Sequence, residues 1–227
     1  MSQSDPDSTY WGNCEVMIFG DNLKGFVFDG EFFSEYYVRN ALSLEQAEIK
    51  YDPIILDKRP KQVAYRLYKL LIGLSNVKHL TLYKQTLAVL THAAELLPHL
   101  PLFPNLIDLE LMISQARLDC VASWRMLQRC PRLETLKFSG GIYCSPDFAI
   151  DSGVPDQGPP CFASSFKCIE VNEYGDEADE LLAVKILLKN AVVLDKMVVY
   201  CCDGSAVSEQ LLELPRGSKS CEVVLFH

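Results

Sequence analysis

The sequence has no run of about 18 consecutive apolar residues, the length that a membrane-spanning helix needs. Residues 1–8 are polar and acidic, and they lack the basic and apolar segments of a signal peptide. No Asn-x-Ser/Thr site for N-glycosylation occurs anywhere in the chain. Together these absences predict an intracellular protein, of the cytoplasm or the nucleus, that makes no contact with a membrane.

Positive charge is scarce and is not clustered. The 227 residues include 21 Lys and Arg against 30 Asp and Glu, which gives a formal net charge of −9. A protein with this balance repels the phosphate backbone of nucleic acids, and no run of basic residues offsets that repulsion. We therefore expect no nucleic acid among its partners.

Motifs for catalysis and metal binding are also missing. There is no Cys-x-x-Cys pair, no glycine-rich phosphate loop and no Gly-x-Ser-x-Gly elbow. Four histidines are present without the spacing of metal ligands, and they are His79, His92, His99 and His227. We expect a non-catalytic protein with no metal and no cofactor.

The nine cysteines are an odd number and lack the spacing of a disulfide framework. Five of them lie next to or within apolar stretches, and these are Cys14, Cys120, Cys130, Cys168 and Cys201. This placement favours free, buried thiols in a reducing compartment. A cysteine–histidine enzyme needs its residues to be neighbours only in space, so a cysteine-based site hidden in the fold is the alternative interpretation.

A recurring phrase is the strongest positive signal. In its clearest copy, residues 103–111, Leu106, Leu109 and Leu111 are spaced three and then two positions apart. Further copies lie at residues 23–28, 44–49, 77–82, 133–138, 166–171 and 194–199, and successive copies begin 21 to 33 residues apart. A period in this range marks a repeat array, and the phrase is typical of the strand of a leucine-rich repeat.

Helical segments are predicted between most of these strands. They cover residues 57–73, 86–97, 119–130, 176–190 and 205–214, and residues 32–40 are also compatible with a helix. Pro60 suits the first turn of the first helix and Gly73 its end. The predicted caps are Thr86 for the second helix and Asp176 with Asp179 for the fourth, and the predicted inward residues include Ala94 and Val121. Further strands are predicted at residues 14–19 and 221–226, and residues 145–160, rich in Pro, Gly, Asp and Ser, form a predicted linker.

The pattern predicts an α/β fold of the solenoid type, with a parallel sheet on its concave side and helices on its convex side. One repeat cannot bury its own apolar face, so neighbouring repeats must stack. Side chains alternate along a strand, so the two leucines of Leu-x-Leu point into the core and the residue between them points outward. If this is right, Leu80, Leu109, Leu136 and Ile169 form one inner row.

The outward positions are the candidate binding site for a protein partner. They include aromatic, charged and sulfur-containing residues, which is the composition of protein-binding surfaces, although solvated strand residues would give a similar pattern. The proposed partner-binding residues are Lys50, Tyr83, Glu110, Met112, Lys137, Glu170 and Tyr200.

Three stretches near the C-terminus carry a resemblance to a known family. Residues 160–171 resemble the opening of the FBD domain of plant F-box proteins, residues 180–199 its core helix and strand, and residues 211–225 its tail. Residues 74–82, 103–111 and 129–136 are similar to the leucine-rich repeats of the same family. The resemblance implies an array in which the FBD unit continues the repeats. The expected division is a frayed start at 1–13, repeats at 14–144, a linker at 145–160 and an FBD domain at 161–227.

The resemblance also implies a function. Family members act as substrate receptors of cullin-type ubiquitin ligases, in which the F-box binds an adaptor and the repeats bind the protein to be modified. Residues 1–13 are too short for an F-box, a helical module of about 40 residues. We expect a protein partner on the concave sheet face and doubt that this chain binds the adaptor. A small-molecule receptor site on the array is a further alternative.

Overall fold

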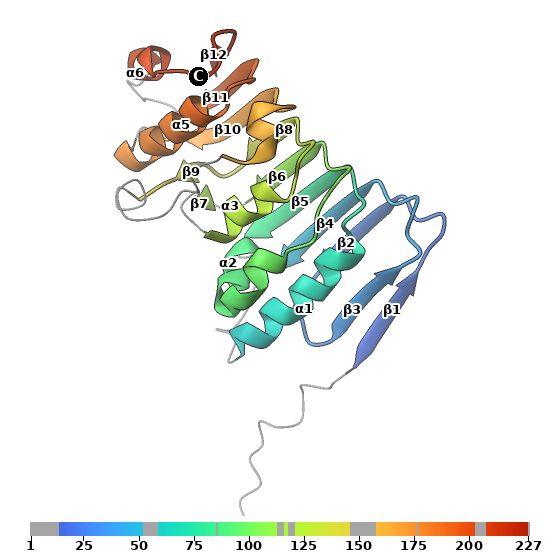
Figure 1. Cartoon of the computed structure of the whole chain (residues 1–227). Helices are drawn as coiled ribbons and strands as arrows, with labels where there is room; N and C mark the ends of the chain where they lie inside the picture. The colour runs from blue at the N-terminus through green and yellow to red at the C-terminus, as the bar shows by residue number, and fades with distance from the viewer. Residues whose placement is uncertain are drawn as a thin grey trace, which may run out of the picture.

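The computed structural model describes residues 14–51, 59–84, 86–112, 116–117, 121–145, 158–175, 177–202 and 208–226. Over these residues the chain forms a mixed α/β fold around a parallel sheet of eight strands (Figure 1). In spatial order the strands are β2 (Gly25–Asp29), β4 (Gln46–Tyr51), β5 (His79–Lys84), β6 (Asp108–Met112), β8 (Thr135–Phe138), β10 (Cys168–Tyr174), β11 (Lys196–Cys201) and β12 (Glu222–Phe226). Spatial order therefore follows chain order, as the repeating phrase predicts.

The connections between these strands form a second layer on one face of the sheet (Figure 1). Its helices are α1 (Pro60–Gly73), α2 (Thr86–Leu90), η2 (Thr91–His99), α3 (Val121–Gln128), η3 (Pro160–Ala163), α5 (Ala178–Asn190) and α6 (Ser208–Glu213). Two small parallel pairs complete the described elements: β1 (Glu15–Phe19) with β3 (Glu35–Arg39), and β7 (Ala116–Arg117) with β9 (Ile142–Tyr143). Parallel neighbours need such crossovers, because every strand must start from the same end of the sheet.

The core lies between the two layers and is continuous along the sheet. One row of strand partners is Ala47, Leu80, Leu109, Leu136, Ile169, Met197 and Val223, and all seven are buried in a single apolar cluster. A second row, two residues further along each strand, is Ile49, Leu82, Leu111, Phe138, Val171 and Val199. The inner row predicted from the sequence is confirmed. Full burial of each large apolar side chain contributes roughly 1.5–3 kcal/mol, so these rows are the main source of stability.

Helix α1 matches its prediction closely. It begins at Pro60, whose missing N–H costs nothing in the first turn, and its buried face includes Val63, Leu67, Leu70 and Leu71. Gly73 ends the helix where it meets β3, and a Cβ atom on Gly73 would lie 2.8 Å from the Val38 carbonyl oxygen. The absence of a side chain therefore lets α1 approach β3 at this point.

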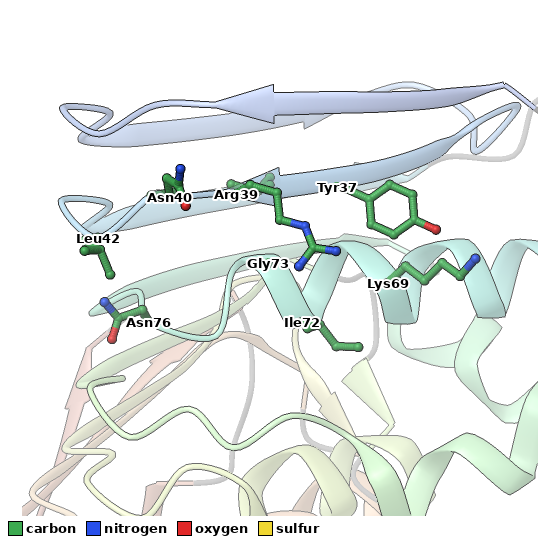
Figure 2. A pocket seen from close by; sticks show the side chains of 10 residues that line it. Tyr37, Arg39, Asn40, Leu42, Lys69, Ile72, Gly73 and Asn76 are labelled. Carbon is green, nitrogen blue, oxygen red and sulfur yellow. The ribbon is translucent and has the colours of Figure 1, made fainter.

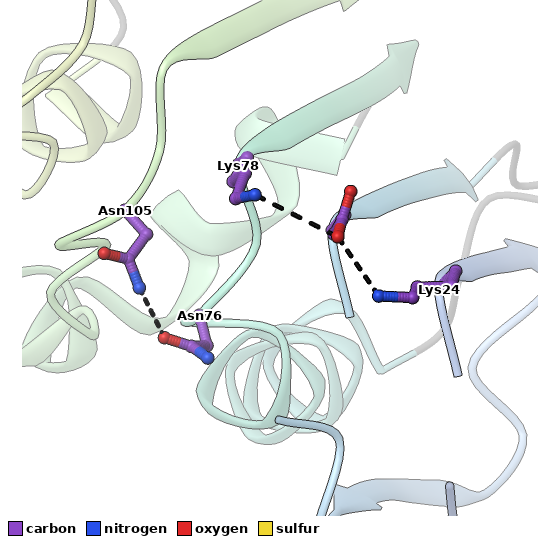
Figure 3. A network of polar contacts seen from close by, with 5 residues as sticks. Lys24, Asn76, Lys78 and Asn105 are labelled. Carbon is purple, nitrogen blue, oxygen red and sulfur yellow. Dashed lines mark hydrogen bonds and ion pairs between the residues drawn. The ribbon is translucent and has the colours of Figure 1, made fainter. Parts of the chain in front are cut away.

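A polar ladder runs along the edge of the sheet where the strands begin (Figure 3). Lys24 and Lys78 both approach Glu45, with Nζ to Oε1 distances of 3.2 and 4.0 Å. The Asn105 side chain donates to Oδ1 of Asn76 at 2.6 Å. The backbone follows the same steps, since the Lys78 amide donates to the Glu45 carbonyl at 2.8 Å. Because exposed ion pairs are worth about 0–1 kcal/mol, the ladder adds less than the core rows do.

Residues 32–40, whose sequence is compatible with a helix, do not form one, because residues 35–39 form strand β3. The segment Glu-Tyr-Tyr-Val-Arg combines aromatic and β-branched residues, which favour a strand, and β1 supplies a partner along its whole length. The predicted strand at 14–19 exists as β1, but it lies outside the eight-stranded sheet and Phe19 is 65% exposed.

The second and third helices depart from prediction in detail. Thr86 is not an acceptor at a helix start, since its hydroxyl donates to the carbonyls of Tyr83 and Ile49. The following segment changes to a 3₁₀ helix at Thr91, which turns Ala94 outward and buries Ala93. Val121, predicted to point inward, is 51% exposed at the start of α3.

The sheet continues past the predicted linker, most of which lies outside the described residues. Strand β10 pairs in parallel with β8, so Ile169 stands beside Leu136. Helix α5 follows, and the carboxylate of Glu180 accepts the backbone N–H groups of Gly175 and Glu177 at 2.9 and 3.0 Å. This cap replaces the predicted cap by Asp176 and Asp179, and Asp176 is not among the described residues.

Candidate functional site

The face of the eight-stranded sheet that is turned away from the helices is the candidate site. We call it the outward face. Its first row consists of strand partners Val27, Glu48, Thr81, Glu110, Lys137, Glu170, Val198 and Val224. Its second row, two residues further along the strands, includes Asp29, Lys50, Tyr83, Met112, Tyr200 and Phe226. All seven binding residues proposed from the sequence lie in these two rows.

At the N-terminal part of the outward face, Glu48, Lys50 and Tyr83 form one cluster. Lys50 Nζ lies 3.4 Å from Glu48 Oε2 and 5.1 Å from the centre of the Tyr83 ring. The Tyr83 hydroxyl donates to Glu48 Oε2 at 3.5 Å. Burial, together with the nearby Glu48 carboxylate, raises the pKa of Tyr83 above its usual value. The hydroxyl is therefore a neutral donor at physiological pH, with its ring covered by a cation.

The middle of the face is a chain of alternating charges. Lys137 lies between Glu110 and Glu170, with Nζ to carboxylate distances of 3.8 and 3.5 Å. The Ser139 hydroxyl donates to Oε1 of Glu110 at 2.6 Å, the same oxygen that Lys137 approaches. With two carboxylates for one ammonium, the cluster carries an excess of negative charge. Since such half-exposed pairs contribute little stability, their main effect is to fix the directions in which these groups point.

At the C-terminal end the face becomes aromatic. The rings of Tyr200 and Phe226 stack with centroids 5.0 Å apart and planes at 16°, and the two residues are 40% and 45% exposed. The sequence-based list omits Phe226, although the strand at 221–226 is predicted and its alternation turns Val224 and Phe226 outward. Val198, expected to be open to solvent, is only 7% exposed.

The proposed residues thus fall into separate groups. Lys50 contacts Tyr83, and Met112, which is 37% exposed, is the strand partner of Tyr83. A separate network joins Glu110, Lys137 and Glu170. Tyr200 lies with Phe226, on the strand beyond Glu170. The structure places every one of them on the outward face but does not bring them into a single pocket.

Three of the buried cysteines are not activated thiols. Burial raises the pKa of Cys161 to about 12, and it raises the pKa values of Cys130 and Cys221 as well. A thiolate is the reactive species, so these groups are poor nucleophiles. The prediction of buried thiols holds for Cys130 but not for Cys14, which is exposed, and Cys168 and Cys201 are half-buried. Cys120 lies outside the described residues.

The described residues contain no group of three or more His, Cys, Asp and Glu side chains that could hold a metal ion. Among the same residues, no helix is both long enough and apolar enough to cross a membrane.

Comparison with known proteins shows which family model and which proteins the chain is similar to. A family model described as FBD matches residues 154–199. An F-box/FBD/LRR-repeat protein of Arabidopsis thaliana is 32% identical over 69% of this chain and 36% of its own length. A putative F-box/FBD/LRR-repeat protein of the same plant is 25% identical over 99% of this chain and 52% of its own length. An FBD-associated F-box protein, also from this plant, is 26% identical over 92% and 46%.

The chain therefore spans between about a third and a half of the length of these curated relatives. No solved structure matches it.

Proposed function

Because the chain belongs to the plant family of FBD-containing F-box/leucine-rich-repeat proteins, we propose that it is a non-catalytic protein-interaction module that binds its partner on the outward face. The observation that carries this proposal is the continuity of that face. Eight adjacent strands present two rows of side chains with charged, aromatic and thioether groups, and none of the described helices covers them (Figure 1). Interfaces of this kind combine aromatic anchors with orienting charges.

The arrangement supports a solenoid of leucine-rich repeats with the outward face as its concave side. Consecutive strands lie side by side, and every described helix returns on the other side of the sheet. We assign residues 14–144 to the repeats, 145–160 to a linker and 161–227 to the FBD unit. The pairing of β8 with β10 supports a sheet shared by the two parts.

Charge and shape indicate what kind of partner fits. The two outward rows contain Asp29, Glu48, Glu110 and Glu170 against Lys50 and Lys137, so acidic groups exceed basic ones. Tyr200 and Phe226 add an exposed apolar surface at one end. The proposed partner is a protein that offers basic side chains to the middle of the face and an apolar side chain to the aromatic pair.

The family context suggests the consequence of binding. The relatives carry F-box in their names, and the proposed role is the substrate-recognition part of a cullin-type ubiquitin ligase. We assign no adaptor contact to the described elements. Buried thiols such as Cys130 and Cys161 fit the reducing cytoplasm or nucleus as the proposed place of action.

Capture from plant extract with matched variants tests the proposal. The bait is the full chain, as wild type and as Tyr83→Ala, Glu170→Lys and Tyr200→Ala, each checked for folding by circular dichroism. The control is Tyr65→Ala, because Tyr65 is similarly exposed, at 37%, but lies on α1 in the helical layer. Captured proteins are quantified by mass spectrometry.

The proposal predicts at least one protein whose recovery falls about tenfold or more with the three outward-face variants, as loss of hot-spot residues does, and is unchanged with Tyr65→Ala. If every captured protein is retained equally by all four variants, the outward face is not the binding surface.

A further inference from the structure

A groove between β3 and α1 lies apart from the outward face, in the helical layer (Figure 2). It is lined by residues 37–42 and by Lys69, Ile72, Gly73 and Asn76, and its cavity volume is about 480 Å³. This volume is within the range of about 300–1,000 Å³ that is usual for small-molecule sites. We call it the β3–α1 groove.

The groove exists because two backbone segments meet at one point and diverge from it. At Gly73 the end of α1 touches the backbone of Val38, with no side chain between them. Beyond this contact the chain leaves β3 through Asn40, which adopts a positive φ of 55°, and continues through Ala41 and Leu42 along the groove. The backbone of Val38 and Gly73 therefore contributes to the lining of the groove.

Charge in the groove is unlike that of the rest of the chain. Its lining contains Arg39 and Lys69 and no acidic residue, although acids exceed bases by 30 to 21 overall. Lys69 is already neutralised, since its Nζ lies 2.5 Å from Glu35 Oε2. Arg39 forms no ion pair or hydrogen bond with any described residue, and its guanidinium carbon lies 5.6 Å from the centre of the Tyr37 ring.

Apolar side chains border the same groove and are open to water. Leu42 is 84% exposed and Ile72 is 45% exposed. In Figure 2, Arg39 reaches from β3 toward the end of α1 near Gly73, Leu42 lies on the turn after β3, and Ile72 lies on α1. A cation without an ion-pair partner, next to apolar side chains, can bind a ligand that combines an acid group with an apolar chain.

We propose that the β3–α1 groove binds a small organic carboxylate, with the carboxylate on the Arg39 guanidinium and the apolar body against Ile72 and Leu42. A guanidinium presents paired N–H donors that match the two oxygens of a carboxylate. The end of α1 bears partial negative charge, so the preference for an acid depends on Arg39. A hollow of this size favours a compact ligand over a protein surface.

The test uses octanoate, octan-1-ol and octylammonium as probes with the full, isotope-labelled chain. Backbone amide shifts in an NMR titration report both the affinity and the site. The variants are Arg39→Gln, Ile72→Glu and a control, Arg132→Gln, which removes an exposed arginine that does not line the groove. A fourth probe, the peptide acetyl-Ala-Leu-Leu with a free C-terminus, distinguishes a peptide end from a small acid.

The proposal predicts that octanoate shifts amides of residues 37–42 and 69–76 and binds about tenfold more tightly than octan-1-ol, as one charge-assisted contact provides. Arg39→Gln removes this preference while octan-1-ol still binds, Ile72→Glu weakens both, and Arg132→Gln changes neither. Equal binding of all three probes, shifts elsewhere in the chain, or tenfold tighter binding of the peptide than of octanoate would overturn it.

Discussion

A buried arginine ties α1 to the segment before β3. Arg66 is 1% exposed, and its Nη1 donates to the Phe32 carbonyl oxygen at 2.6 Å. The Phe32 ring stacks on Phe28 of β2 with centroids 4.4 Å apart. A hydrogen bond from a charged donor is stronger than one between neutral groups, so this contact fixes the position of the helical layer over the first strands of the sheet.

At the same scale, the Glu35–Lys69 pair gives a pH prediction. The hydrogen bond from Lys69 lowers the pKa of Glu35 below its usual value of 4.5, and the same bond raises the pKa of Lys69 above its usual 10.5. The pair therefore stabilises the fold above pH 4.5 and below pH 10.5. Glu35→Gln should lower the free energy of unfolding by about 0.5–1 kcal/mol at pH 7, as one half-exposed ion pair does.

The direction of this pH effect follows from the lowered pKa of Glu35, because the folded state favours the ionised carboxylate. The contribution of Glu35 begins to fall below pH 4.5 and disappears as pH falls through the lowered pKa of Glu35, so wild type and Glu35→Gln should converge at acidic pH. Urea unfolding at a series of pH values measures the difference. Glu222→Gln, which removes an exposed acid on β12, serves as control and should show no such convergence. A Glu35→Gln difference that is the same at pH 3 and pH 7 would contradict the assignment.

Along each strand of the sheet, residues alternate between the core and the outward face, and β6 shows this most clearly. Leu109 is 2% exposed in the inner row, whereas Glu110 lies on the outward face and approaches Lys137. Leu109→Ala should lower the free energy of unfolding by about 2–5 kcal/mol, because it leaves a cavity in a packed core. Glu110→Ala should change it by less than about 1 kcal/mol.

Chemical unfolding of both variants measures this difference in unfolding free energy. The capture experiment described above measures the effect of Glu110→Ala on partner binding. Glu110→Ala should alter the recovery of the partner while the protein stays folded. Similar unfolding free energies for the two variants would contradict the assignment of Leu109 to stability and of Glu110 to binding.

The elements could be predicted from the sequence wherever one signal dominated. The Leu-x-x-Leu-x-Leu spacing located β5, β6 and β8, and the period of 3.6 located α1 from Val63 to Leu71. The signal was ambiguous at residues 32–40, where Phe33, Tyr36 and Tyr37 fit either structure and only pairing with β1 decides for a strand. Helix breaks such as that at Ala93, with φ −131°, depend on packing that a periodic pattern does not contain.

On the scale of the whole molecule, the outward face was predictable and the groove was not. Alternation alone places Lys50, Tyr83, Lys137 and Tyr200 on one side of the sheet, because their strands share one register. The β3–α1 groove depends on how residues 37–42 approach residues 69–76, some 30 positions later in the chain. No short sequence pattern encodes that distance.

The residues before and after the predicted linker form one body with one core. Residues on both sides of the predicted linker contribute to it, since the Trp124 ring on α3 meets the Phe162 ring on η3 at a centroid distance of 6.0 Å. Strand β10 then extends the sheet from β8. A partner that contacts both halves of the outward face requires this continuity.

Equilibrium unfolding in urea tests whether the two parts share one core. The background variant is Trp11→Phe, so that fluorescence reports on Trp124 alone. Far-ultraviolet circular dichroism follows the whole chain in the same samples. One shared core predicts that the two signals change in a single transition with the same midpoint, and that Leu136→Ala shifts both midpoints equally. Two separate transitions, or a Leu136→Ala shift confined to one signal, would contradict the account.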